Sequence, residues 1–242
     1  MSPARVFIWR HGRTMWNAER RFQGQADPPL DDVGRAQAAQ AAALLASLRP
    51  DVIISSDLQR AYQTAEALGT VSGVQPVFDE RLRERSLGHW EGLTRDEVAE
   101  RYPEELDDWI AGRDVRSRGG ESREQVAERS SASFAEIGDI ETAVLVTHSA
   151  TALALTSQLL HLSQSVHVLG PLANCHWSEL QSQGAGWRLR AHNAGPPGLV
   201  IPLPFVEEES PDATAIDAGP PDVRALGALR MSRPVGEEER LR

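Results

Sequence analysis

Lysine is absent from this chain of 242 residues, so all 25 of its basic side chains are arginines. The 35 acidic residues outnumber them and give a formal net charge of −10. This balance argues against a general affinity for nucleic acids or anionic membranes, because both require clustered positive charge. An anionic ligand is still compatible with it, since a few converging arginines can form a positive pocket on an acidic protein.

Cysteine and long apolar runs are also scarce. Cys175 is the single cysteine, so no intramolecular disulfide can form, which fits a reducing compartment. The run Val6–Trp9 is too short for a signal peptide, and no stretch is apolar for long enough to span a bilayer. We therefore expect a cytoplasmic protein with no membrane contact. Five histidines show no spacing typical of a metal set, so neither a metal nor another cofactor is expected: His89, His161, His167, His176 and His192.

Short apolar segments alternate with helical patterns along most of the chain. Buried strands are predicted at Arg5–Trp9, Asp51–Ser55 and Ala143–Thr147, and a further strand is predicted at Val74–Phe78. Helices are predicted from Asp31 or Asp32 to Ser47, from Leu58 (capped by Asp57) to Leu68, over Thr94–Arg101 and Glu104–Ala111, from Ser122 to Ile137, and over Ala150–Leu160. Cys175–Leu180 and Trp187–Ala191 are predicted to pair as antiparallel strands. This alternation is typical of an α/β fold with a mostly parallel sheet.

The composition changes at Pro196. Gly and Pro become frequent, acidic clusters occur at 207–209 and 237–239, and no helical period is sustained. We interpret residues 1–195 as the catalytic domain and 196–242 as an acidic, poorly ordered tail. A small partner-binding element within 199–206 is the alternative for part of this tail.

Two histidines follow directly after two predicted buried strands. His11 comes after the first strand, and His148 comes after the strand Ala143–Thr147. Ligands of parallel α/β sheets bind at the carboxyl ends of the strands, so both side chains are expected at one site. Histidines with satisfied hydrogen bonds in the core, or at helix caps, are the alternative interpretation.

The residues around His11 suit a phosphate. Arg10 can bind phosphate oxygens with two parallel hydrogen bonds, and Gly12 allows the backbone to approach a ligand closely. A neutral imidazole can attack phosphorus if its other nitrogen donates to a backbone carbonyl. Arg60 lies one turn into the second predicted helix and could neutralise further phosphate charge. Taken alone, it would be interpreted as a solvated charge.

The run from Ile8 to Thr14, followed by Trp16 and Asn17, resembles the opening motif of the histidine phosphatase superfamily, which includes the cofactor-dependent phosphoglycerate mutases. Further motifs continue the pattern in the same order: Phe22-Gln23-Gly24, Asp27 and Leu30, Gly34 and Gln37-Ala38, Ser55–Ala61 with Thr64-Ala65, Leu82-Arg83-Glu84, Leu87–Gly92, Gly120-Glu121-Ser122, and Val146-Thr147-His148. Order and spacing match over residues 5–180. The ordered set is far more specific than any one motif.

The resemblance implies a three-layer α/β/α sandwich like that of the phosphoglycerate mutases. It also implies a metal-independent reaction through a phosphohistidine. His11 would be the nucleophile, with Arg10, Arg60 and His148 forming the phosphate pocket. Glu84 would protonate the leaving oxygen and later act as the base for water.

Contacts with phosphate or substrate are implied for Asn17, Gln23 and Ser149. Ser149 stands where the family commonly has Gly, so a side chain intrudes there. Without the resemblance, Glu84 would be interpreted as a surface ion pair with Arg83 or Arg85. Dimers are common among relatives, so a homodimer is compatible with the resemblance, although the sequence carries no interface signature.

Three functions fit the motifs. The segment between Gly92 and Gly119 is short, whereas mutases have a longer insertion there, and Leu87 stands where mutases often have Tyr. We therefore favour a phosphatase, with water as acceptor, over a cofactor-dependent mutase. A non-catalytic phosphate-binding regulatory module is the alternative of another class, but such proteins usually lose the nucleophile or the acid.

The substrate class is implied at the subfamily level. Residues 87–94, 119–123 and 174–177 resemble segments of glucosyl-3-phosphoglycerate phosphatases. The same motifs occur in broad-specificity phosphatases. The expected partner is therefore a small phosphoester, either a sugar phosphate or a phosphoglycerate-type ester.

Overall fold

The computed structural model describes residues 2–163, 168–184 and 186–197. The predicted tail 196–242 lies outside these described residues from 198 onward. The elements follow in the order β1 (Arg5–Arg10), α1 (Met15–Ala18), α2 (Asp32–Ala46), β2 (Val52–Ser55), α3 (Gln59–Ser72), β3 (Val77–Phe78), the 3₁₀ helices η1 (Glu80–Leu82) and η2 (Gly88–Trp90), α4 (Arg95–Arg101), α5 (Pro103–Ile110), α6 (Arg123–Ala135), β4 (Thr142–Thr147), α7 (Ser149–Leu159), β5 (Trp177–Gln183) and β6 (Gly186–Ala194).

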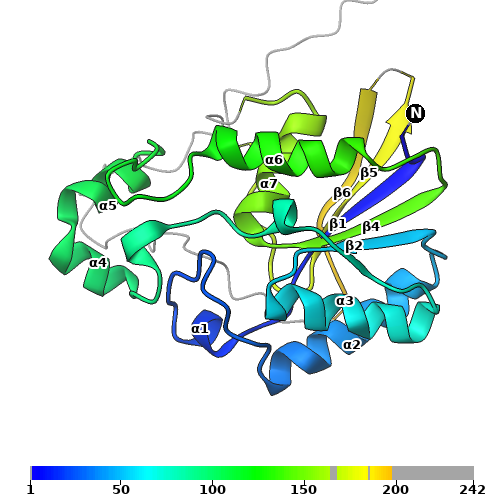
Figure 1. Cartoon of the computed structure of the whole chain (residues 1–242), viewed down its shortest axis with the longest axis horizontal. Helices are drawn as coiled ribbons and strands as arrows, with labels where there is room; N and C mark the ends of the chain where they lie inside the picture. Colours follow the sequence, from blue (N-terminus) through cyan, green and yellow to red (C-terminus); the bar gives the residue numbers. More distant parts are fainter. Residues whose placement is uncertain (1, 164–167, 185, 198–242) are drawn as a thin grey trace, which may run out of the picture. The chain divides into compact units, whose positions relative to one another are not determined.

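The strands form one six-stranded sheet in the order β3-β2-β4-β1-β5-β6 (Figure 1). β1 to β4 run parallel to one another, whereas β5 runs antiparallel to its neighbours β1 and β6. The predicted mostly parallel sheet and the antiparallel pair at its end are therefore confirmed. β1 and β4 lie at the centre and are covered on both faces, which explains their continuous apolar runs.

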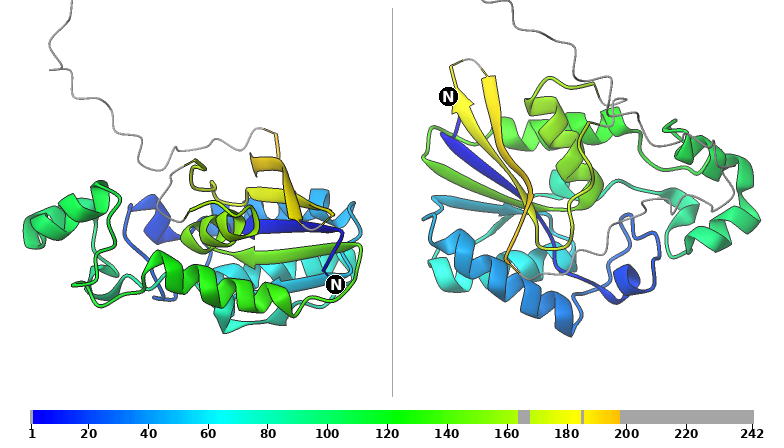
Figure 2. Two further views of the ribbon diagram at one scale, coloured as in Figure 1. Left: turned by 90° about the horizontal axis from the view of Figure 1, so that it is seen from above. Right: turned by 180° about the vertical axis from the view of Figure 1, so that it is seen from behind.

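Alternate side chains of β1 point into two separate cores. Phe7 and Trp9 pack with residues of α2 and α3, whereas Val6 and Ile8 pack with residues of α6 and α7. Figures 1 and 2 show the two helix pairs on opposite faces of the sheet. The three-layer α/β/α sandwich is thus confirmed.

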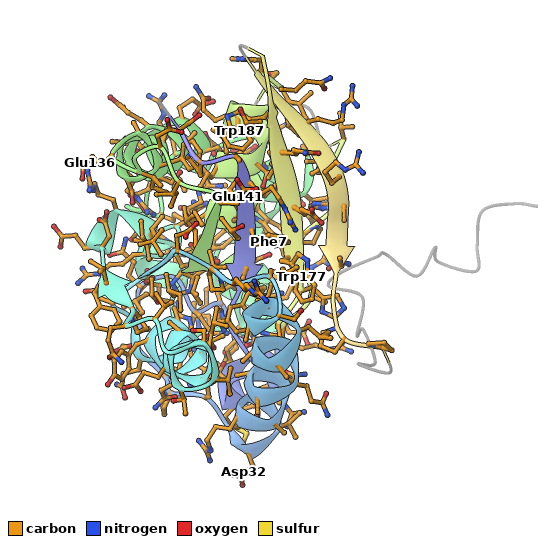
Figure 3. All side chains as sticks on the ribbon, turned by 90° about the vertical axis from the view of Figure 1, so that its right-hand side faces the viewer. Phe7, Asp32, Glu136, Glu141, Trp177 and Trp187 are labelled. Atoms are coloured by element: carbon orange, nitrogen blue, oxygen red, sulfur yellow. The ribbon has the colours of Figure 1, made fainter. Side chains whose placement is uncertain are left out.

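The N-terminus of α2 is capped by Asp31. Its Oδ1 accepts a hydrogen bond from the Gly34 N–H at 2.7 Å, as an N-cap carboxylate should. The neighbouring Asp32, the other predicted cap, projects outward at the end of the helix, as Figure 3 shows, and its side chain is 96% exposed. Both residues were predicted as possible caps, and the structure shows that Asp31 is the cap.

The predicted cap of α3 is wrong. Asp57 forms an ion pair with Arg83 instead, and the N-cap residue Leu58 offers no side-chain hydrogen bond. The first N–H of the helix, that of Gln59, is bound by Asp27 Oδ1 at 2.6 Å. A carboxylate therefore does cap α3, but it comes from a loop 32 residues earlier in the chain.

The helices α4 and α5 pack around a small core of their own. Trp90 is fully buried there among Val98, Leu106 and Val115. The Phe22 ring lies 5.2 Å from the Trp90 ring, so the loop that follows α1 is attached to this core. Among the described residues, no helix combines the length and the apolar character needed to cross a membrane.

Leu45 and Leu44 provide a matched test of the core beneath α2. Leu45 is fully buried, whereas Leu44 is 42% exposed. We expect Leu45→Ala to lower the free energy of unfolding by about 2–5 kcal/mol, because it removes buried methyl groups and leaves a cavity. Leu44→Ala should change it by less than about 1 kcal/mol. Urea unfolding of both variants checks this, and equal losses would contradict the placement of α2.

Candidate active site

The carboxyl ends of β1, β4 and β2 meet at one edge of the sheet. The His11 N–H donates to the Thr147 carbonyl at 2.9 Å, and the Ser56 N–H donates to the Val146 carbonyl at 2.9 Å. The loops that leave the strands therefore begin side by side. As a result the rings of His11 and His148, predicted at one site, have centroids 5.0 Å apart.

His11 is held as a neutral imidazole with one free nitrogen. Its Nδ1 lies 2.7 Å from the Gly12 carbonyl, which can only accept, so Nδ1 carries the hydrogen and Nε2 keeps its lone pair. The ring is 2% exposed. Burial lowers its pKa well below 6.5, and the charges of Arg60 and Arg10 lower it further. Nε2 therefore has a free lone pair, which could attack phosphorus without a separate base.

Gly12 is required for packing against the start of α2. A Cβ at this position would lie 2.5 Å from the Gly34 carbonyl oxygen, so only glycine lets the loop pass the start of α2. The Gly12 N–H donates to Thr64 Oγ1 at 3.1 Å and is directed into α3. The expectation that Gly12 brings the backbone close to a ligand stays a prediction.

Arg60 is not the solvated charge that its position on a helix suggests. It is fully buried, and its Nη1 and Nη2 donate to the carbonyls of Ala26 and Gly24, each at 2.7 Å. Burial lowers its pKa to about 10, so it stays charged at neutral pH. The loop 22–26 thus holds the guanidinium in place.

His148 orients Arg60. Arg60 Nε donates to His148 Nδ1 at 3.2 Å, because an arginine Nε can only donate. The hydrogen of this imidazole is therefore on Nε2, which donates to Ser56 Oγ at 2.8 Å. Burial lowers the pKa of His148 well below 6.5, with further lowering by Arg60 and His11.

Arg10 completes the positive side of the site. Its Nη1 donates to the Leu172 carbonyl, and its buried Nε has no hydrogen-bond partner in the part of the chain that the structure describes. Burial lowers the pKa of Arg10, while the nearby Glu84 charge opposes that change. An unpaired N–H beside His11 is what an anion would use.

Glu84 lies at the N-terminus of α7. Its carboxylate accepts hydrogen bonds from the N–H groups of Arg85 at 2.8 Å and of Ala150 and Thr151 at 3.2 Å. The ion pair with a neighbouring arginine is wrong as an interpretation, since Arg83 pairs with Asp57 and Arg85 with Asp114. The Glu84 charge also acts on both Arg10 and Arg60, which places it at the same site.

The three predicted substrate contacts differ in their surroundings. Asn17 Oδ1 accepts from the Thr14 N–H at 3.1 Å, within the cap of the short helix α1. Gln23 Oε1 is buried with no hydrogen-bond partner among the described residues. Ser149 is the first residue of α7 and is half-buried next to His148.

Ser56 and Asn174 support the site and were not identified as site residues. Asn174 Nδ2 donates to the His11 carbonyl at 3.1 Å and to Asn17 Oδ1 at 3.4 Å. Both residues lie in segments that were noted for their motifs. Their hydrogen bonds, however, join them to His148 and His11, which are far away in the sequence, so no local pattern indicates them. No group of three or more metal-ligating side chains occurs among the described residues.

The site can be compared with known proteins. The family model of the histidine phosphatase superfamily (branch 1) matches residues 6–195. The chain belongs to this superfamily. A glucosyl-3-phosphoglycerate phosphatase of Mycolicibacterium vanbaalenii is 41% identical over 191 residues, which cover 74% of this chain and 85% of the relative. A probable phosphoglycerate mutase of Salmonella paratyphi C is 37% identical over 186 residues, covering 75% and 86%.

A solved structure of a protein with the same name as the first relative is also similar to this chain. The mycobacterial glucosyl-3-phosphoglycerate phosphatase in complex with VO3 superposes with a TM-score of 0.71 at 37% identity, covering 79% of this chain and 100% of that one. This histidine phosphatase is accordingly an enzyme of the phosphoric monoester hydrolase type, as its motifs predicted.

The neutral state of His11 gives a pH-dependent expectation. As the pH falls below 6.5, the unfolded imidazole takes up a proton that the folded ring does not, so the free energy of unfolding falls. His11→Gln removes this contribution. When the pH is lowered from 7.5 to 5.5, its free energy of unfolding should therefore fall less than that of the wild type. Urea unfolding at both pH values tests the difference, and NMR should show a neutral His11 ring at pH 6. A ring that titrates near pH 6.5 would contradict the assignment.

Proposed function

We propose that this enzyme hydrolyses phosphate monoesters in two steps through a phosphohistidine on His11. In the first step the Nε2 lone pair forms the N–P bond as the P–O bond to the leaving group breaks. Arg10 and Arg60 neutralise the phosphoryl oxygens, and His148 keeps Arg60 in position. The observation that carries the proposal is the bond from His11 Nδ1–H to the Gly12 carbonyl, because it leaves Nε2 free to attack.

Glu84 supplies and removes the protons. In the first step its carboxyl proton passes to the leaving alkoxide oxygen. In the second step the Glu84 carboxylate takes a proton from water, the water oxygen binds phosphorus, and the P–N bond breaks. His11 and the protonated Glu84 are then regenerated together with inorganic phosphate.

Asn17, Gln23 and Ser149 are the proposed contacts with phosphate or substrate. The Thr14 N–H occupies the Asn17 oxygen, so the Asn17 amide nitrogen is the group that could donate to a ligand, and the unpaired Gln23 oxygen can accept from a substrate hydroxyl. The Ser149 N–H lies at the start of α7, where a helix binds anions. We place this catalytic domain at residues 1–195, which the family match over 6–195 supports.

The proposed substrate is a phosphoglycerate-type ester, with glucosyl-3-phosphoglycerate as the leading candidate. The relatives that carry this name support the proposal, because their sequences and a solved structure match most of this chain. The leading candidate should give a kcat/KM at least about 10-fold above those of plain sugar phosphates, since its glycerate carboxylate offers a second charge to recognise. Phosphate release from a panel of such esters would check this. Equal values across the panel would indicate a broad-specificity phosphatase.

The nucleophile can be tested against a matched histidine. His11→Ala should lower phosphate release from 4-nitrophenyl phosphate by at least about 1,000-fold, because no other group can form the N–P bond. The exposed His161 serves as the control, and His161→Ala should keep wild-type rates. Both assays are run in excess EDTA. Full activity of His11→Ala would contradict the mechanism, and loss of wild-type activity in EDTA would contradict metal independence.

A phosphoglycerate mutase activity alongside hydrolysis is the second candidate function, because the Salmonella relative is named a probable phosphoglycerate mutase. The two activities differ in the phosphoryl acceptor. Enzyme labelled on His11 by 2,3-bisphosphoglycerate should release inorganic phosphate to water if it is a phosphatase. Transfer of the label to 3-phosphoglycerate would identify a mutase.

A further inference from the structure

The peptide backbone on either side of Glu84 is bound by a partly buried ion pair that the mechanism does not use. Arg129 on α6 donates from Nε to Glu121 Oε1 at 2.7 Å and from Nη2 to Glu121 Oε2 at 3.0 Å. This two-bond geometry is the strong, directional form of an arginine–carboxylate pair. The side chains of Arg129 and Glu121 are only 18% and 23% exposed, respectively.

The remaining donors of Arg129 reach the segment that carries the acid. Its Nη2 also donates to the Glu84 carbonyl at 3.0 Å, and its Nη1 donates to the Arg81 carbonyl at 2.6 Å. Gln25 Nε2 donates to the same Glu84 carbonyl at 3.2 Å. The Glu84 carbonyl therefore has two donors, from a helix and from a loop that are far apart in the sequence.

Glu121 holds the next peptide group. Its Oε2 accepts from the Ser86 N–H at 2.8 Å, and its own N–H donates to the Ser86 carbonyl at 3.0 Å. The Glu121 carbonyl in turn accepts from Arg85 Nε at 2.8 Å. Burial would raise the pKa of Glu121, but the Arg129 bonds and the Ser86 N–H outweigh it and lower the pKa, so the pair stays charged at neutral pH.

These contacts fix the backbone of residues 84–86 on one side, while the α7 N-terminus binds the Glu84 carboxylate on the other. Neither Arg129 nor Glu121 hydrogen-bonds to His11, Arg10 or Arg60 in the described residues, so their hydrogen bonds reach the site through the segment that carries Glu84. The Arg129 charge also acts on His148, but that effect does not depend on the leaving group. A shift of about 1 Å in a reacting group can cost about 100-fold in rate, so the restraint matters chemically.

We infer that Arg129 and Glu121 are positioning residues, which set where Glu84 delivers its proton. This inference rests on the proposed function, in which Glu84 is the acid. Loss of the pair should impair the proton transfers of Glu84, and in the first step the loss should depend on how strongly the leaving oxygen needs the proton. An alkyl phosphate has a strongly basic leaving oxygen and needs a proton donor, whereas 4-nitrophenolate leaves without one.

The test compares kcat/KM for an alkyl ester, 3-phosphoglycerate, with that for 4-nitrophenyl phosphate. This ratio includes only steps up to release of the alcohol, so hydrolysis of the phosphohistidine does not enter it. Arg129→Gln should lower kcat/KM for the alkyl ester by about 10- to 100-fold and for the aryl ester by less than about 3-fold. Glu121→Gln keeps the shape of the side chain and should show the same pattern. This second variant carries the test if Arg129→Gln does not fold.

Two further variants separate the possible results. Arg113→Gln removes an exposed pair with Asp108, and it should leave both kcat/KM values unchanged. Glu84→Gln should show the strongest selective loss on the alkyl ester, about 100-fold or more. If Glu84→Gln shows no selective loss, the proposed function fails. If it does, but folded Arg129→Gln and Glu121→Gln lose activity equally on both esters or not at all, the positioning role is overturned.

Discussion

The parallel pairing of β1 with β4 is the constraint from which the site follows. Arg10 lies opposite Thr147 in the register, so the next residue of each strand, His11 and His148, emerges at the same edge. The two chain segments are more than 130 positions apart, and only the sheet brings them together. A shift of the register by one residue would turn one histidine to the opposite face.

Much of this arrangement could be predicted from the sequence. The apolar runs that end at His11 and His148 identify central strands and place both side chains at the carboxyl edge. The long-range hydrogen bonds could not be predicted in this way. The cap of α3 is Asp27 rather than the adjacent Asp57, and Arg60 is buried because a distant loop supplies carbonyls to it. Local patterns describe neighbours along the chain, whereas these partners are set by the tertiary fold.

The hydrogen bonds of Glu84 also could not be predicted from its neighbours in the sequence. Its sequence neighbours are arginines, which favours a local ion pair, yet both arginines bind other carboxylates. The carboxylate is instead held by main-chain N–H groups, which every residue except proline has and which no sequence pattern can reveal. Only the resemblance to a family pointed to its role. The structure adds its position, which is at a helix N-terminus beside the positive groups of the site.

The way in which Arg60 is held has a consequence for the chain's exclusive use of arginine. A guanidinium has five N–H groups in one plane, and three of them are directed to His148, Gly24 and Ala26. Two N–H groups are left to serve a ligand, and their directions are already fixed before it arrives. A lysine has three donors on a flexible stem and would exhaust them on the same partners. Lysine at this position would therefore keep the charge but lose the recognition.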